Sequence, residues 1–466
     1  MNELWRLSAS EVARLVRARK VSTREVADAA LQRLDSVNPR INAIVDYRAD
    51  HVLEQADRID AVLARGGDPG PLAGVTVTVK INIDQAGFAT SDGSRLHAKN
   101  LARTNSPTLD NLMRSGAVLL GRSNAPTFAV RWFTSNLLYG ATRNPRNPLL
   151  TPGGSSGGGA AAVAAGIGHI ALGTDIGGSV RYPAYACGVH GLRPSLGRVP
   201  AYNASLPEVG IGPQLMAITG PMARTVEDLR ISLLAMSAAD SRDPWWVPAP
   251  FEGPSLPLRA ALCPRPREME VAPEVENAVR EAGRRLADAG WIVEEIEDTP
   301  PLGEAGQIQE RLWFGDGFDQ FADAVERDGD PGALAVLTAA RPRVAAYPPD
   351  ALSRALVQRA TVTRQWQLFL SNYAVLLVPV SGELPFPDGL DLQGEAGFKR
   401  VWDAQLLMRA LPVMGIPALT VSSGFANGSP VGVQIVAGRY REDLCLRAGE
   451  AIEARGAPPA PIDPRG

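Results

Sequence analysis

The stretch from Thr151 to Gly159, which reads TPGGSSGGG, constrains this chain more than any other part of its sequence. Two serines lie between glycines, and glycine lets the backbone adopt positive φ and approach a ligand closely. Such a stretch can be a linker or a phosphate loop. An alanine-rich run follows at once, which disfavours a linker, and no lysine follows at the spacing of a Walker loop. We therefore expect an ordered loop and a small-residue helix over 157–168.

A second serine follows glycines in the stretch 173–181, which reads GTDIGGSVR. It continues a strand predicted at 170–174, so Ser179 is expected at the turn that leaves this strand. Consecutive backbone N–H groups in such a turn can hold an oxyanion beside a Ser179 nucleophile. The N–H groups concerned are those of Ile176, Gly177, Gly178 and Ser179. Taken alone, a purely structural Gly-Gly turn explains this stretch equally well.

Lys80 ends a run of β-branched residues, Val75 to Val79, which predicts a buried strand. Lysine is seldom buried without a role, and loss of solvation lowers its pKa until it can act as a base. The alternative for a lysine at a strand end is a side chain that reaches solvent.

Histidine is the usual base for a serine nucleophile, but the four histidines here lie outside any catalytic motif. His51 falls on a predicted surface helix, His169 between a helix and a strand, and His97 and His190 in loops. No spacing typical of a metal site occurs. The three cysteines are scattered and form no C-x-x-C pair, which argues against a disulfide framework or a zinc site. We therefore expect neither a metal nor a cofactor.

Composition and charge favour an ordinary globular protein. The formal net charge is −3 with both signs interspersed, so the chain lacks the basic surface of a nucleic-acid binder. The N-terminal residues contain no apolar signal-peptide region, and no run of 18 apolar residues occurs. These observations predict a cytoplasmic protein that binds neither nucleic acid nor membrane.

Strands alternate with helices along the chain, which predicts an α/β fold. Helices are expected first, with capping boxes at Ser8 with Glu11 and at Ser22 with Glu25, an end at Asn38-Pro39, and a third helix over 49–64. We expect one domain over 1–466. It comprises a helical segment at 1–65, a catalytic α/β core at about 66–235 and 372–455, and an additional α/β and helical region at about 240–371.

Together, the Lys80 strand, the GGSSGGG loop and the GTDIGGSVR segment resemble the amidase signature family of serine amidohydrolases, including bacterial amidases and aryl acylamidases. The resemblance covers nearly the whole chain, and Ser155 and Ser179 have the spacing found in that family. It implies the amidase signature fold, a mixed central β-sheet sandwiched by α-helices.

The resemblance also implies a role for each matching residue. Ser179 resembles the nucleophile, Ser155 the bridging serine that follows a cis peptide bond from Gly154, and Lys80 the base. Residues expected to support the loop by hydrogen bonds are Thr174, Asp175 and Arg181. The sequence departs from the common pattern at Thr76, where proline is usual, and at Ile81, where aspartate is usual. Both changes are expected to affect the surroundings of Lys80 and to leave the catalytic groups in place.

A predicted loop at 199–223 carries apolar residues and only one charge, Glu208, which suits a lid over a substrate cleft. With the loop before Ser155, it predicts an apolar, partly aromatic pocket formed by Phe128, Trp132, Phe133, Tyr139, Tyr202, Leu206, Met216 and Ile218. The same residues can instead belong to the core.

The function expected from these features is hydrolysis of carboxylic amides through a Ser179 acyl-enzyme, without cofactor or metal. Small neutral aryl or alkyl amides, esters and carbamates (urethanes) suit the pocket. Two alternatives remain at this point: the glutaminase subunit of a tRNA-dependent amidotransferase, and a non-catalytic binding protein on the same fold. A monomer or homodimer is expected.

Overall fold

A computed structural model describes residues 3–465 of the chain. Met1, Asn2 and Gly466, the outermost residues of the predicted single domain, lie outside this range. An eleven-stranded mixed sheet runs through the molecule, with the strand order β1-β3-β2-β6-β8-β7-β12-β13-β11-β9-β10. The predicted fold class, a mixed central sheet flanked by helices, is confirmed. Its strands are β1 (Ile44–Asp46), β2 (Thr76–Lys80), β3 (Val118–Ser123), β6 (Ile170–Asp175), β7 (His190–Arg193), β8 (Ile218–Ala223), β9 (Arg259–Leu262), β10 (Ile292–Glu295), β11 (Val375–Val378), β12 (Ala418–Ala426) and β13 (Ser429–Val436).

Alternate residues of the strands enter different clusters, because successive side chains of a strand point to opposite faces. Val375 and Leu377 of β11 join one core cluster, whereas Leu376 and Val378 join another. Both faces of the sheet are therefore covered, which explains why β11, with the sequence VLLV, is apolar at every position.

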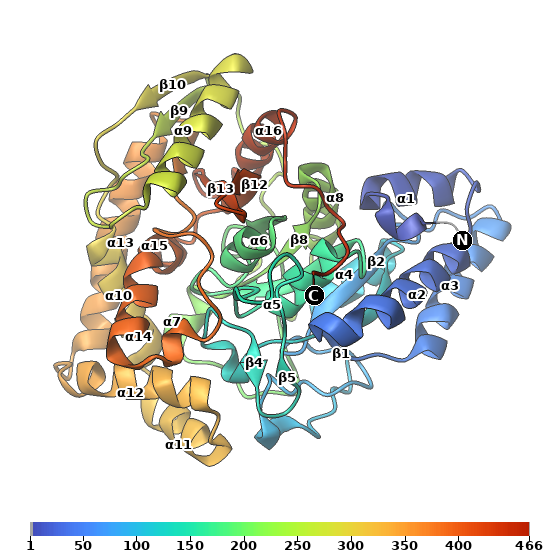
Figure 1. Cartoon of the computed structure of the whole chain (residues 1–466), viewed down its shortest axis with the longest axis horizontal. Helices are drawn as coiled ribbons and strands as arrows, with labels where there is room; N and C mark the ends of the chain where they lie inside the picture. The colour runs from blue at the N-terminus through green and yellow to red at the C-terminus, as the bar shows by residue number, and fades with distance from the viewer. Residues whose placement is uncertain (1–2, 466) are drawn as a thin grey trace.

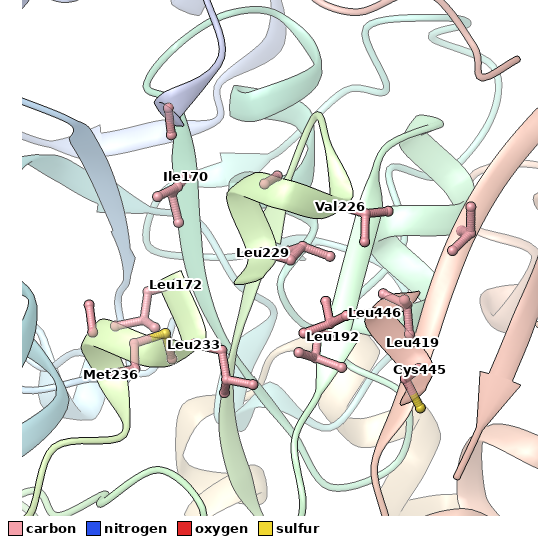
Figure 2. Close-up of a cluster of buried hydrophobic side chains, with 14 of the residues drawn as sticks. Ile170, Leu172, Leu192, Val226, Leu229, Leu233, Met236, Leu419, Cys445 and Leu446 are labelled. Atoms are coloured by element: carbon pink, nitrogen blue, oxygen red, sulfur yellow. The ribbon is translucent and has the colours of Figure 1, made fainter. Parts of the chain in front are cut away.

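One face is covered by helices from both ends of the chain. They are α1 (Ala9–Arg17), α4 (Pro107–Arg114), α8 (Val226–Met236), α9 (Pro273–Asp288) and α16 (Glu442–Glu453). Figure 2 shows part of this cluster, where Leu229, Leu233 and Met236 of α8 lie near strand residues such as Leu172 and Leu192.

The opposite face is covered by two groups of helices. The first group comprises α2 (Thr23–Ile41), α3 (Ala49–Ala64), α5 (Gly157–Ala164) and α6 (Arg181–Cys187). The second comprises α10 (Gly303–Phe314), α13 (Ala351–Leu370) and α15 (Leu406–Met414). Helices α1 to α3 lie at one end of the molecule, and α10 to α14 lie at the other (Figure 1).

The remaining elements are short or peripheral. They are the hairpin β4 (Ser135–Asn136) and β5 (Gly140–Ala141), and helices α7 (Ile211–Gln214), α11 (Phe318–Asp328), α12 (Pro331–Ala345) and α14 (Gly394–Ala404). Within the described residues, no helix is both long enough and apolar enough to cross a membrane.

Local predictions near the N-terminus are largely confirmed. Both capping boxes form, at Ser8 with Glu11 and at Ser22 with Glu25. The predicted end of the second helix at Asn38-Pro39 is wrong, because α2 continues to Ile41. Pro39 removes only one hydrogen bond of the helix, so α2 continues past it. The helix ends at Asn42, which adopts the left-handed conformation at φ 49°.

Two predicted segments near the cleft differ from the structure. The helix expected over 157–168 ends at Ala164, and Gly166 and Gly168 follow with positive φ, which an α-helix does not accommodate. The predicted loop at 199–223 is a loop only in part, because it contains the short helix α7 and ends in strand β8.

Candidate active site

Strands β2 and β6 are parallel neighbours, so their carboxyl ends meet at the same edge of the sheet. Lys80 ends β2 and Asp175 ends β6. The segment from Ile176 to Ser179 turns away from this edge and leads into α6. Ser155 lies in the loop before α5, and the N–H of Ser156 donates to the carbonyl oxygen of Ser179 over 3.2 Å, which joins the two serine loops.

The structure brings Lys80, Ser155 and Ser179 together at one buried place. The Lys80 Nζ lies 2.7 Å from Ser155 Oγ and 2.9 Å from Thr174 Oγ1. Exposure of the three residues is 0% for Lys80, 1% for Ser155 and 6% for Ser179, so Ser179 is the one most open to the cavity. The peptide bond from Gly154 to Ser155 is cis, as the family resemblance implies.

No hydrogen bond joins Ser155 Oγ to Ser179 Oγ in the structure of residues 3–465. Hydrogen bonds between catalytic groups are often long without substrate and tighten when it binds. Ser155 contacts Lys80 and lines the same cavity as Ser179.

Burial lowers the pKa of Lys80 from its ordinary value to about 7, although the carboxyl groups of Asp92 and Asp175 oppose this shift. An ammonium group loses its hydration when it is buried, and the neutral amine is favoured as a result.

Asp175 organises the turn that carries Ser179. Its buried carboxylate binds Arg181 at 3.0 Å and Arg193 at 3.2 Å. Burial by itself would raise the pKa of Asp175, but the two arginines outweigh burial and hold this pKa well below its usual range. Arg193 was not among the predicted site residues, and its only sequence signal is an arginine at the end of a strand.

The predicted oxyanion hole needs one correction. The N–H of Gly178 donates to Asp175 Oδ1 over 2.9 Å, and the carbonyl of Gly177 in the same peptide unit accepts from Trp132 Nε1 over 2.8 Å. This peptide is held on both sides, so its N–H is not available to an oxyanion. Among the described residues, the N–H groups of Ile176, Gly177 and Ser179 donate to no protein group.

Glycine is required at two positions near these serines. A Cβ on Gly154 would lie 2.5 Å from the backbone of Arg131 and Phe133. Gly178 has φ 98°, and a Cβ there would lie 2.5 Å from Met408 Sδ. The loops can approach this closely only because these side chains are absent.

A cavity of about 560 Å³ opens beside Ser155 and Ser179. Four of the predicted pocket residues line it: Phe128, Tyr202, Leu206 and Ile218. Residues that the sequence analysis missed also line it, including Trp245, Trp313, Asn82 and Asp92. The segment 199–217, which belongs to the predicted lid at 199–223, contributes more of the wall than any other single stretch of the chain.

The other four predicted pocket residues lie outside this wall. Phe133 packs on Phe386 in a core cluster, and Met216 is buried in another. Tyr139 lies in the turn between β4 and β5, and Trp132 supports the Gly177 carbonyl. Apolar residues of a loop serve core and pocket equally well, so their chemistry alone did not separate the two.

A second cavity, of about 910 Å³, is lined by residues of α10, α14 and α15 and contains none of the predicted catalytic groups. Within residues 3–465, no group of three or more histidine, cysteine or acidic side chains has a geometry that would hold a metal ion. The smaller cavity is therefore the candidate active site.

Comparison with known proteins agrees with this geometry. The family model described as Amidase matches residues 25–446. Indoleacetamide hydrolase of Bradyrhizobium diazoefficiens is 37% identical over 456 residues, which cover 97% of this chain and 87% of that protein. Acylamidase of Rhodococcus erythropolis is 33% identical and covers 96% and 95% of the two chains.

A glutamyl-tRNA(Gln) amidotransferase subunit of a Roseiflexus species is 32% identical over 97% of each chain. Among solved structures, a bacterial aryl acylamidase of the amidase signature family superimposes with a TM-score of 0.82 at 25% identity, covering 96% of this chain and 95% of the other. All of these proteins are similar over nearly the whole chain.

Proposed function

The chain belongs to the amidase signature family of amide hydrolases, and from this premise we propose that it cleaves neutral amides through an acyl-enzyme on Ser179. The observation that carries the proposal is the 2.7 Å contact between Lys80 Nζ and Ser155 Oγ, buried beside Ser179 in one cavity. A lysine with a lowered pKa that contacts Ser155, with Ser179 lining the same cavity, supports a proton path that closes when substrate binds.

The proposed reaction begins when neutral Lys80 accepts a proton from Ser155 and Ser155 accepts one from Ser179. Ser179 Oγ then attacks the carbonyl carbon, and the oxyanion is held by the free amides of Ile176, Gly177 and Ser179. Ser155 returns a proton to the leaving amine, which departs. Water then attacks the acyl-enzyme, and the same groups transfer the protons.

The cavity wall supports small neutral substrates with an aromatic or alkyl group. Its side chains include Phe128, Tyr202, Trp245 and Trp313, and large apolar and aromatic surfaces favour such groups. Aryl amides, arylacetamides, esters and carbamates all give an acyl-enzyme by the same attack. Arylacetamides are included because a relative of similar length is an indoleacetamide hydrolase.

The experiment compares nitroaniline release from 4-nitroacetanilide by the wild type, Ser179→Ala and Ser156→Ala. Ser156 is the matched control, because it is adjacent to Ser155 and its Oγ contacts only the carbonyl of Thr174. We expect turnover by the wild type and Ser156→Ala and none by Ser179→Ala. A fluorophosphonate should label Ser179 in the wild type and in Ser156→Ala. Equal activity of Ser179→Ala and the wild type would contradict the acyl-enzyme.

A second candidate function is glutamine hydrolysis as part of an amidotransferase, which the similarity to the Roseiflexus amidotransferase subunit favours. The cavity wall carries polar side chains such as Asn82, Asp92 and Arg242, which suit the polar and charged groups of glutamine, beside the aromatic side chains that suit neutral amides. Ammonia release from glutamine, increased by a co-purified second subunit, would support this candidate instead.

A further inference from the structure

Asp92 stands apart from the other acidic residues of the active-site cavity. Asp175 is paired with two arginines, and Asp243 accepts hydrogen bonds from the N–H groups of Ala201 and Trp245. Glu208 is exposed at the surface. Asp92 lines the same cavity as Ser155 and Ser179, yet its Oδ1 is buried and has no hydrogen-bond partner within the described residues.

The backbone holds Asp92 in this position from two sides. Its N–H donates to the carbonyl of Ile81, next to Lys80, over 3.4 Å, and its carbonyl accepts from the N–H of Phe128 over 2.8 Å. Asp92 also has φ 50°, a left-handed conformation that aspartate tolerates better than most residues. Such conformations cost free energy and tend to persist at functional sites.

A buried carboxyl oxygen without a partner is costly, and a bound ligand that supplies a donor removes the cost. Burial raises the pKa of Asp92 and Lys80 opposes this rise. The carbonyl oxygen of a carboxyl group accepts a hydrogen bond whether or not the group is protonated. Asp92 lines the cavity and therefore offers a carboxyl acceptor in either state.

We propose that Asp92 is a specificity-determining residue that accepts a hydrogen bond from the N–H of the bound substrate. This inference rests on the proposed function and deepens it. Substrates that carry an N–H beside the scissile carbonyl, which include secondary amides and carbamates, are then favoured over tertiary amides and esters that lack it.

The test uses matched substrates, 4-nitroacetanilide and its N-methyl derivative, which differ in this N–H. The selectivity is the ratio of their kcat/KM values, measured for the wild type, Asp92→Gly and Asp92→Asn. Intrinsic differences in reactivity between the two substrates are the same for every variant, so they cancel when the selectivity of a variant is compared with that of the wild type. Glycine adopts φ 50° without strain and removes the carboxyl, whereas asparagine also tolerates this conformation and keeps a carbonyl oxygen.

We expect Asp92→Gly to lower the selectivity about tenfold, the loss typical of one hydrogen bond. Asp92→Asn should retain most of it. An unchanged selectivity in Asp92→Gly would overturn the proposal. Equal slowing of both substrates with a displaced pH profile would also overturn it, because Asp92 would then act through Lys80.

A binding measurement separates this proposal from the proposed function. Calorimetry would measure the binding affinities of acetanilide and N-methylacetanilide for the Ser179→Ala variant and for the double variant Ser179→Ala with Asp92→Gly. If the wild type hydrolyses no anilide, the proposed function fails, but a preference for acetanilide that disappears with Asp92→Gly still supports the hydrogen bond. The absence of any preference on Ser179→Ala contradicts it.

Discussion

Trp132 Nε1 donates a 2.8 Å hydrogen bond to the carbonyl of Gly177, and this bond fixes the peptide unit beside the amides of Gly177 and Ser179, which we propose as oxyanion donors. The indole ring also packs edge-on against Trp402, with ring centroids 5.9 Å apart. A side chain outside the cavity wall thus holds the Gly177–Gly178 peptide, which lies between the unpaired amides of Gly177 and Ser179.

Replacement of Trp132 by phenylalanine removes this hydrogen bond and keeps an aromatic ring against Trp402. We expect kcat to fall by roughly tenfold with little change in KM, since preorganised donors act mainly on the transition state. Steady-state kinetics with the nitroanilide measure both constants. Trp402→Phe is the control, because it changes the same ring pair and leaves the Gly177 contact in place. Equal losses in both variants would assign the effect to packing.

The proposed base makes the reaction depend on pH. Lys80 accepts a proton only when it is neutral, and burial lowers its pKa to about 7. The value of kcat/KM should therefore fall as the pH drops through about 7 and should level off above it. Initial rates between pH 5 and 9, corrected with Ser179→Ala at each pH, give the profile. A profile that is flat over this range would contradict a lysine base.

Lys80 is also expected to destabilise the folded protein. Its pKa is lower in the folded chain than in the unfolded chain, so the unfolded state binds more protons between about pH 7 and 10. Stability therefore falls as the pH decreases through this window. Lys80→Met should abolish turnover and stabilise the protein by about 1–2 kcal/mol at pH 7.

Thermal unfolding of Lys80→Met and the wild type, at pH 7 and again at pH 10, tests this expectation. The increase in Tm of Lys80→Met over the wild type should be larger at pH 7 than at pH 10. A lower Tm for Lys80→Met at pH 7 would show that the contacts of Nζ with Ser155 and Thr174 outweigh the cost of burying the amine.

Gly178→Ala places a methyl group against Met408 at a backbone φ of 98°. Such backbone strain costs on the order of 1–3 kcal/mol, and the turn should relieve it by moving Ser179. We expect kcat to fall at least about tenfold. Gly424→Ala is the matched control, because no atom lies within 4 Å of the added Cβ and φ is not positive there. Loss of activity in both variants would point to a general effect of alanine on folding.

The parts of the site that depend on local sequence could be predicted. Lys80 ends a β-branched strand, and the glycines around Ser155 and Ser179 indicate tight loops, so local patterns predicted the elements that carry these residues. Their proposed roles came from the resemblance to the amidase signature family. The engaged N–H of Gly178 could not be predicted, because it depends on how Asp175 and Trp132 meet the same peptide.

The pocket was predicted less well for the same reason. Phe128 and Phe133 lie in one loop and have the same side chain, yet Phe128 lines the cavity and Phe133 packs on Phe386. Asp92 has no distinguishing signal in the sequence. Its significance comes from a buried oxygen without a partner among the residues that the structure describes, and that depends on the surrounding fold.

The strand ends that carry the proposed catalytic groups and a large part of the cavity wall come from different parts of the architecture. Lys80 and Asp175 sit at the ends of central strands, whereas residues 199–217 form much of the wall and belong to a connection between β7 and β8. Relatives that share the sheet can therefore evolve new substrate preferences by exchanging this connection while the chemistry is inherited intact. An engineer who transplants the connection from one relative to another should move the preference with it.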